Sequence, residues 1–101
     1  MYSQHNIFLV AKIIVNRLTI KETKIKLHEA VGKRIMEFCN ERNISPNKLC
    51  TMSGVIQSTI NSIFSGRSQN PKLLTIECLC EGLGIKLKDF FDSPLFDDID
   101  N

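Results

Sequence analysis

Apolar residues recur three or four positions apart along most of the chain. This period places them on one face of a helix. The pattern predicts helices over about residues 29–43, 46–53, 57–65, 73–83 and 87–91, with one further turn after Ser93. The apolar faces expected to form the core contain the following residues: Val31, Ile35, Phe38, Cys39, Leu49, Cys50, Met52, Ile56, Ile60, Ile63, Phe64, Leu73, Ile76, Leu79, Cys80 and Leu83. The pattern therefore predicts a helical domain from residue 29 to residue 92.

Local signals mark several of the helix ends. Ser45 can cap free backbone N–H groups, and Pro46 is preset for a first helical turn. Gly54, Gly66 and Gly84 each follow an apolar-periodic run, where glycine ends a helix in a left-handed conformation without steric cost. These residues predict short connections between the helices.

Residues 1–28 fit neither the helical nor the strand period. β-branched residues are dense from Ile13 to Ile25, which favours an extended segment or a hairpin around residues 21–24. The segment also carries more apolar surface than a free tail should expose. We therefore expect an N-terminal extension over 1–28 that mediates self-association, and an acidic tail over 93–101. The alternative is an extension that folds back on its own domain or stays disordered.

The composition is that of one small globular domain: 101 residues, 43% hydrophobic and 24% charged. No apolar run is long enough to span a membrane, and the run at residues 7–11 makes a poor signal peptide. These features favour a cytoplasmic protein. The net charge is +4 over residues 1–28, +3 over 29–72 and −5 over 73–101. This polarity indicates a basic face for an anionic partner, or simply a solvated surface.

Neither metal binding nor catalysis is indicated. The cysteines at positions 39, 50, 78 and 80 match neither paired CxxC zinc ligands nor a CxxC redox motif, so buried free thiols are expected. His5 and His28 are far apart, with His28 expected just before a helix, and no nucleophile–histidine or paired-carboxylate arrangement stands out. We therefore expect no cofactor, no metal, no small-molecule substrate and no enzymatic activity, although a fold can assemble a site that the sequence hides.

The exposed face of the third predicted helix has an unusual composition. Its residues are small or amide and none is charged: Gln57, Ser58, Asn61, Ser62 and Ser65. Serine and asparagine are mediocre helix formers, so helix stability does not explain them. Short polar side chains suit a helix in the major groove of DNA, where an amide can make two hydrogen bonds to one base edge. A polar face without a partner is the alternative.

The order and spacing of several motifs resemble a known family, the phage Cro and repressor type helix-turn-helix domains, or XRE family. The resemblance runs from Val31 to Phe91. Its central motif is Leu49-Cys50-x-x-x-Gly54-Val55-x-x-x-Thr59-Ile60-x-x-Ile63-x-x-Gly66. Two further motifs are Asn70-Pro71-x-Leu73 and Leu83-Gly84-Ile85-x-Leu87-x-x-Phe90-Phe91.

The resemblance implies an all-α, five-helix, lambda-repressor-like domain that binds operator DNA as a homodimer and regulates transcription. Its base-facing positions are matched by Gln57, Ser58, Asn61 and Ser62. Its backbone- and phosphate-contacting positions are matched by Pro46, Asn47, Arg67, Gln69 and Lys72. Lys48 adds a positive charge near the start of the second helix. Two departures are Pro46, which cannot donate a hydrogen bond, and Ile56, which stands where the family has a Ser or Thr cap.

The leading hypothesis is a sequence-specific regulator, most simply a repressor, that occupies an operator on double-stranded DNA. The runner-up is a protein-interaction module such as an antitoxin that binds a toxin. Acidic side chains of the tail covering the Gln57 face would favour the runner-up. Lys33, Arg34 and Arg42 are expected to be solvated on the first helix, with contact to phosphates as the alternative. Phe90 with one neighbouring aromatic ring is expected in the core, and the alternative is a dimer seam formed by Phe90, Phe91 and Phe96.

Overall fold

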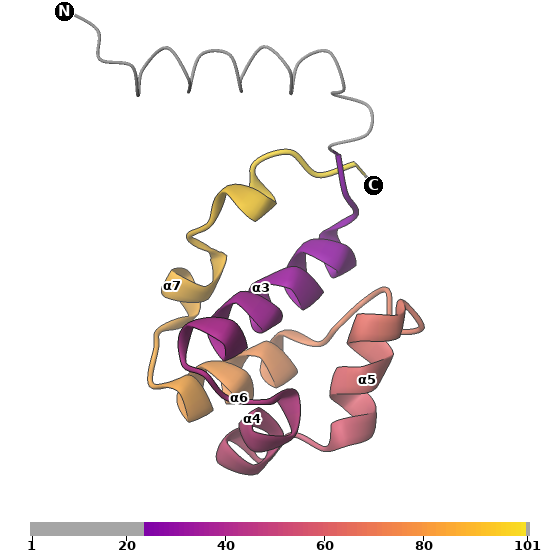
Figure 1. Cartoon of the computed structure of the whole chain (residues 1–101). Coiled ribbons are helices and arrows are strands. Elements are labelled where there is room, and N and C mark those ends of the chain that lie inside the picture. Colours follow the sequence, from indigo (N-terminus) through magenta and orange to yellow (C-terminus); the bar gives the residue numbers. More distant parts are fainter. Residues whose placement is uncertain (1–23, 101) are drawn as a thin grey trace, which may run out of the picture.

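The computed structural model describes residues 24–100, and this part of the chain is helical (Figure 1). It contains five α-helices and a short 3₁₀ helix, so the predicted all-α fold is confirmed for this part of the chain. The elements are α3 (Leu27–Glu41), α4 (Pro46–Ser53), α5 (Gln57–Ser65), α6 (Leu73–Leu83), α7 (Leu87–Phe91) and η1 (Pro94–Phe96).

The ends of α4, α5 and α6 lie where the sequence predicts them. The Ser45 hydroxyl accepts a hydrogen bond from the backbone N–H of Lys48 at 3.1 Å, and Pro46 is the first residue of α4. Gly54 ends α4 with a φ of 74°, a left-handed conformation that favours glycine. The turn after Gly54 leads directly into α5, because only Val55 and Ile56 separate it from Gln57.

The first helix, α3, begins two residues earlier than expected. His28 lies inside its first turn and is buried, although the sequence had placed it before the helix. The backbone N–H of Lys26 donates to a carboxylate oxygen of Glu29 at 3.3 Å. A glutamate three residues into the helix therefore satisfies the backbone at this start, where no Ser or Thr signals it.

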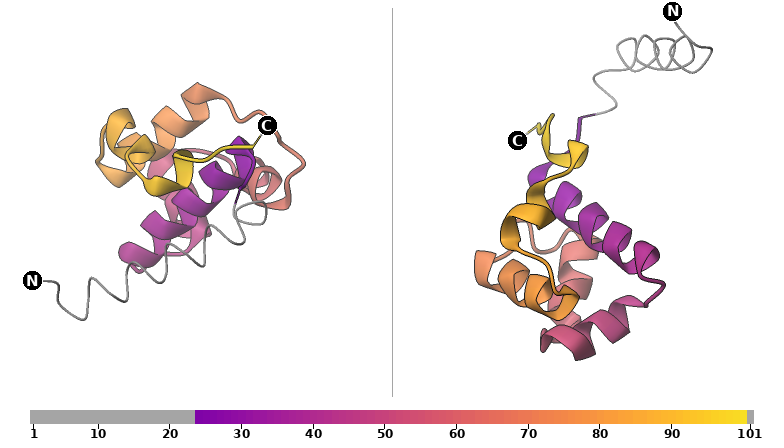
Figure 2. Two further views of the ribbon diagram at one scale, coloured as in Figure 1. Left: turned by 90° about the horizontal axis from the view of Figure 1, so that it is seen from above. Right: turned by 90° about the vertical axis from the view of Figure 1, so that its left-hand side faces the viewer.

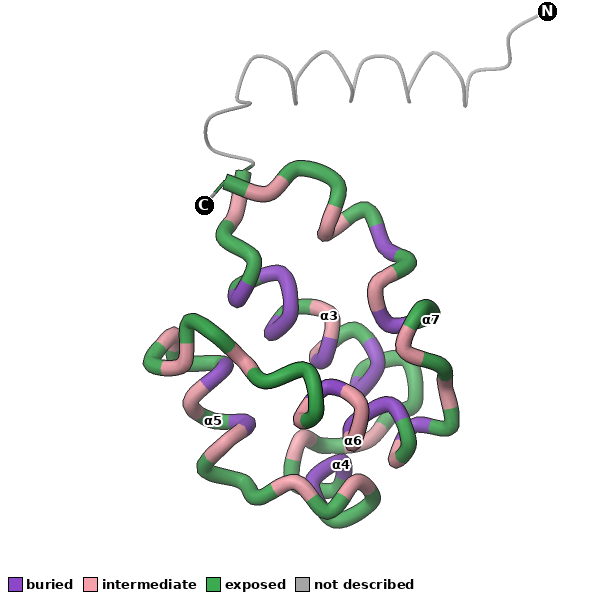
Figure 3. Tube along the Cα trace, turned by 180° about the vertical axis from the view of Figure 1, so that it is seen from behind, coloured by how far each residue is buried: buried purple, intermediate pink, exposed green. Residues whose placement is uncertain are grey.

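The core is formed by one face of each helix (Figure 3). Its buried apolar residues are Val31, Ile35, Phe38, Cys39, Leu49, Cys50, Ile60, Ile63, Ile76, Leu79, Cys80, Leu83 and Phe90. Four residues expected in the core are instead exposed: Met52, Ile56, Phe64 and Leu73. All four lie at or next to a terminus of a helix.

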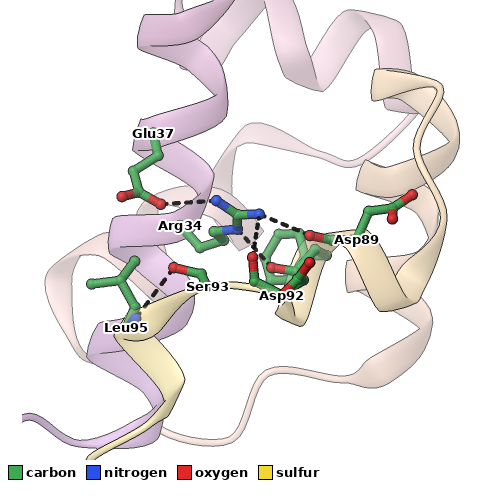
Figure 4. A network of polar contacts seen from close by, with 7 residues as sticks. Arg34, Glu37, Asp89, Asp92, Ser93 and Leu95 are labelled. Atoms are coloured by element: carbon green, nitrogen blue, oxygen red, sulfur yellow. Dashed lines mark hydrogen bonds and ion pairs between the residues drawn. The ribbon is translucent and has the colours of Figure 1, made fainter.

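Arg34 and Arg42 are not merely solvated, which corrects the expectation for α3. The Arg34 guanidinium donates to the backbone carbonyls of Phe90 at 2.6 Å, Asp89 at 2.8 Å and Asp92 at 3.3 Å (Figure 4). It also pairs with Glu37 at 3.1 Å. Arg42 donates to the backbone carbonyl of Leu83. Both arginines therefore satisfy carbonyl groups at helix C-termini, where positive charge is favourable.

The C-terminal segment returns to the start of α3 (Figure 2). Ile25 and Ile99 form a parallel β-bridge, and the backbone N–H of Asp100 donates to the Ile25 carbonyl at 2.9 Å. Lys24 and Asp98 form an exposed ion pair at 3.8 Å. The predicted extended segment or hairpin lies outside the described residues except for residues 24 and 25, and the division at residues 28 and 92 stays a prediction.

An aromatic cluster joins this segment to the core. The Phe90 ring stacks on Phe38 with centroids 6.0 Å apart, and it lies 5.1 Å from the Phe91 ring. The Phe96 ring lies 5.0 Å from Phe91. Phe90 is fully buried and the other two rings pack against the core. The tail residues around Phe96 thus belong to the packed body of the domain.

The thiols are free, and three of the four lie in the core as expected. Cys39, Cys50 and Cys80 are buried, whereas Cys78 is only half-buried. Burial raises the pKa of the three core thiols, because the thiolate would lose its hydration there. Between residues 24 and 100 no His, Cys, Asp and Glu side chains cluster as a metal site would require. None of the helices in this range is long and apolar enough to cross a membrane.

Candidate nucleic-acid interface

The α4–turn–α5 unit is held against the rest of the domain through α6. A Cβ placed on Gly82 of α6 would lie 2.8 Å from both Cα and Cβ of Ser53 in α4. This separation is too short for any side chain, so Gly82 allows the two helices to touch backbone to backbone. Ser53 in turn donates its hydroxyl to the Leu49 carbonyl at 2.7 Å. Close packing of α4 on α6 therefore fixes the position of α4, and with it the position of α5, relative to the rest of the domain.

The outer face of α5 is polar and open. Ile60 and Ile63 are buried on the inner face, so the helix is anchored along one side. The polar side chains found by sequence lie on the other side. Of these, Gln57, Ser58, Asn61 and Ser65 are exposed and Ser62 is half-buried. The structure thus brings the predicted base-facing residues together on one accessible face.

One side-chain contact links the starts of α4 and α5. The Gln57 Nε2 amide donates a hydrogen bond to Oδ1 of Asn47. Asn47 is the second residue of α4 and Gln57 the first residue of α5, and both are exposed. The contact joins a predicted base-facing residue to a predicted backbone-contacting one. It restricts the Gln57 side chain while its carbonyl oxygen stays available to a partner.

The two helix N-termini of this unit differ in how they are capped. Ser45 caps α4, but Ile56 at the N-cap of α5 offers no side-chain hydrogen bond. The first backbone N–H groups of α5 therefore keep their capacity to donate. A helix N-terminus carries a partial positive charge and favours an anionic group such as a phosphate.

The loop after α5 carries further predicted phosphate-contacting residues. The backbone of this loop is tied to α5 through a hydrogen bond from Ser68 N–H to the Ser62 carbonyl at 3.0 Å. Arg67 contacts the Ser65 hydroxyl through both its backbone N–H and its Nε, each at 3.4 Å. Arg67, Gln69 and Lys72 are all exposed, as is Lys48 on α4. Arg67, Gln69 and Lys72 thus lie in the loop that connects α5 to α6, whereas Lys48 lies on α4.

No acidic residue occurs between Arg42 and Ile76, the stretch that contains α4, α5 and the loop. Four basic residues fall within it: Arg42, Lys48, Arg67 and Lys72. The acidic residues of the described part of the chain lie instead on α3, in α6 from Glu77 onward, in and after α7, and in the C-terminal segment. The sequence already shows this run without acidic residues, but net charges summed over 1–28, 29–72 and 73–101 conceal it. It leaves the α4–α5 surface free of carboxylates from its own elements.

Comparison with known proteins identifies this arrangement. The Cro/C1-type HTH DNA-binding domain matches residues 34–94, more than half of the chain. The chain belongs to the Cro/C1-type helix-turn-helix family. The resemblance noted from the sequence motifs is thereby confirmed, and the chain carries a DNA-binding domain.

A solved structure supports the assignment to the Cro/C1-type family. The chain is 37% identical to the prophage Lp1 protein 11, whose crystal structure superimposes with a TM-score of 0.66. The alignment covers 74% of this chain and 99% of the prophage protein. A search of the curated proteins found no match. The Cro/C1-type domain of the present chain includes α4 to α7 and the part of α3 from Arg34 onward, and it ends at the first residue of η1.

Proposed function

We propose that this protein is a sequence-specific regulator of transcription that acts by occupying an operator on double-stranded DNA. The observation that carries the proposal is the exposed, uncharged polar face of α5, which lies within a stretch of chain, residues 42–76, that contains no acidic residue. A face of this kind can lie against base edges without repelling the phosphates on either side.

The proposal divides the surface residues into two groups. The polar face of α5 reads the bases, and its members are Gln57, Ser58, Asn61 and Ser62. The residues around it contact phosphates, and they are Asn47, Lys48, Arg67, Gln69 and Lys72. Phosphate contacts set the position of the protein on the duplex, whereas base contacts set its sequence preference. The Gln57–Asn47 hydrogen bond couples the two groups.

Repression is the simplest outcome of such binding, because a protein bound at the operator sterically blocks polymerase. A single small domain covers few base pairs, so we propose a homodimer that binds two half-sites about 34 Å apart. The protein acts in the cytoplasm, with no enzymatic step and no cofactor.

The C-terminal segment favours this proposal over an antitoxin-like protein-interaction module. Its residues Asp98, Ile99 and Asp100 contact Lys24 and Ile25 beside the start of α3. Figures 1 and 2 place this segment at the end of the molecule far from α4 and from the N-terminal end of α5. The tail therefore leaves the polar face uncovered.

Selection from a pool of random duplexes tests the proposal. We expect the full chain to enrich one sequence motif. Gln57→Ala should change the base preference at one position of this motif, because it removes about 1–3 kcal/mol of discrimination between bases there. Lys72→Ala should weaken binding to every sequence alike. Asn40→Ala and Lys88→Ala are matched controls, because these exposed side chains lie on α3 and α7. Enrichment of no motif would refute the proposal.

A further inference from the structure

Ile56, at the N-cap of α5, has no structural reason to be isoleucine. Its side chain is 67% exposed and so contributes little to the core. Its backbone is extended, with φ −73° and ψ 147°, a conformation in which Ser, Thr, Asn or Asp would cap the helix. Isoleucine makes no such hydrogen bond. Local stability therefore disfavours the residue found here.

The other helix starts show that an apolar N-cap is particular to α5. Serine stands before α4 and before η1, and in both places its hydroxyl accepts a backbone hydrogen bond. Lysine stands before α3, α6 and α7. Among the helix starts between residues 24 and 100, only that of α5 presents an aliphatic side chain to solvent at the N-cap.

The place of Ile56 indicates what it touches. It directly precedes Gln57, whose amide is held by Asn47 at the base-facing end of the proposed interface. In a helix-turn-helix complex, the first residues of the recognition helix approach base edges in the major groove. Among the four bases only thymine presents a methyl group there, at C5. An exposed aliphatic side chain has no other apolar partner on a base edge.

We infer that Ile56 is a specificity-determining residue that contacts a thymine C5-methyl group in each half-site; the inference rests on the proposed DNA-binding function. Gln57 can pair bidentately with an adenine, and the thymine lies in the same base pair or the adjacent one. The two neighbouring side chains then read A·T pairs by complementary means. Gln57 uses hydrogen bonds, and Ile56 excludes water from a methyl group.

Replacement of single thymines by deoxyuridine in the selected duplex tests this inference. Uracil keeps every hydrogen-bonding group of thymine and lacks only the methyl group. For the full chain we expect that each half-site contains one thymine whose replacement by itself weakens binding about fourfold, as expected for burial of one methyl group. Ile56→Ser should bind the thymine and uracil duplexes equally. The same variant should raise the thermal midpoint, because serine supplies the missing cap.

Leu74→Ala is the matched control, because Leu74 is 71% exposed and lies on α6. It should retain the full response to uracil. Sequence-specific binding that no uracil replacement weakens would overturn the inference and leave the proposed function intact. A response to uracil that persists in Ile56→Ser would overturn it as well. A change of oligomeric state in Ile56→Ser, seen by sedimentation, would assign the side chain to a protein contact instead. Failure to select any sequence would overturn both proposals.

Discussion

At the scale of single residues, two glycines in the helices have opposite roles. A methyl group on Gly82 would lie within 2.8 Å of Ser53, on the backbone of α4. A methyl group on Gly32 in α3 would meet the Phe64 ring at 3.6 Å, an ordinary contact distance. Gly82 is therefore required by packing, whereas Gly32 only lowers the helix propensity of α3.

We predict that Gly82→Ala lowers the free energy of unfolding by about 1–2 kcal/mol, because overpacking outweighs the gain in helix propensity. Gly32→Ala is the control with the same chemical change. It should raise the free energy of unfolding by about 0.5–1 kcal/mol. Urea titrations followed by circular dichroism measure both values. Equal effects of the two substitutions would refute the close contact between α4 and α6.

At the scale of whole elements, the sequence predicts the helices whose ends carry local signals. Ser45, Pro46 and Gly54 set the limits of α4 through their own caps and backbone conformations. The start of α3 was misplaced because Lys26 and Leu27 carry no such signal, and the backbone there is satisfied by Glu29. The sequence also identified the polar face of α5, because that face follows from helical period alone.

Contacts between distant residues could not be predicted in this way. The carbonyl groups that Arg34 satisfies belong to residues 55 to 58 positions later in the chain. The bridge between Ile25 and Ile99 joins residues that are even farther apart in the sequence. The contact between Asn47 and Gln57 depends on the angle between two helices. The spacing of residues in a single sequence does not reveal any of these pairs, so only the structure could identify them.

The Arg34 contacts predict how the end of the domain is stabilised. Arg34→Ala removes three hydrogen bonds to the segment Asp89–Asp92 and the guanidinium that lies 4.3 Å from the Phe38 ring centroid. We expect a loss of about 2 kcal/mol of stability, and we expect amide hydrogen exchange to accelerate relative to the parent protein more in α7 than in α5. Arg34→Lys should recover only part of the loss, since an ammonium group cannot span the three carbonyls.

Lys33→Ala is the control for this prediction, because Lys33 is the exposed neighbour of Arg34 on α3. It should leave exchange in α7 unchanged. If the amides of α7 exchange as slowly in Arg34→Ala as in the parent protein, the Arg34 contacts do not stabilise this helix.

At the scale of the whole molecule, we predict that the proposed homodimer depends on the N-terminal extension over 1–28, and in particular on its residues 1–23. This segment contains the apolar run at 7–11 and several β-branched residues. We predict that the full chain sediments as a dimer and that a chain starting at Lys24 sediments as a monomer. The shortened chain keeps Lys24 and Ile25, because both contact the C-terminal segment. If the full chain and the shortened chain both sediment as dimers, or both as monomers, residues 1–23 are not the association element.

The central claim is that the α4–α5 surface binds DNA through both phosphates and bases. Fluorescence anisotropy of the full chain with the selected duplex and with a scrambled duplex, across a series of salt concentrations, tests it most directly. For about four to six neutralised phosphates per bound domain, the logarithm of the association constant should fall with the logarithm of salt concentration at a slope of about −4 to −5 for each domain, and about twice as steeply for the proposed homodimer. The selected duplex should bind roughly a thousandfold or more tightly than the scrambled one. Equal affinity for the two duplexes, or affinity that does not change with salt, would contradict the account.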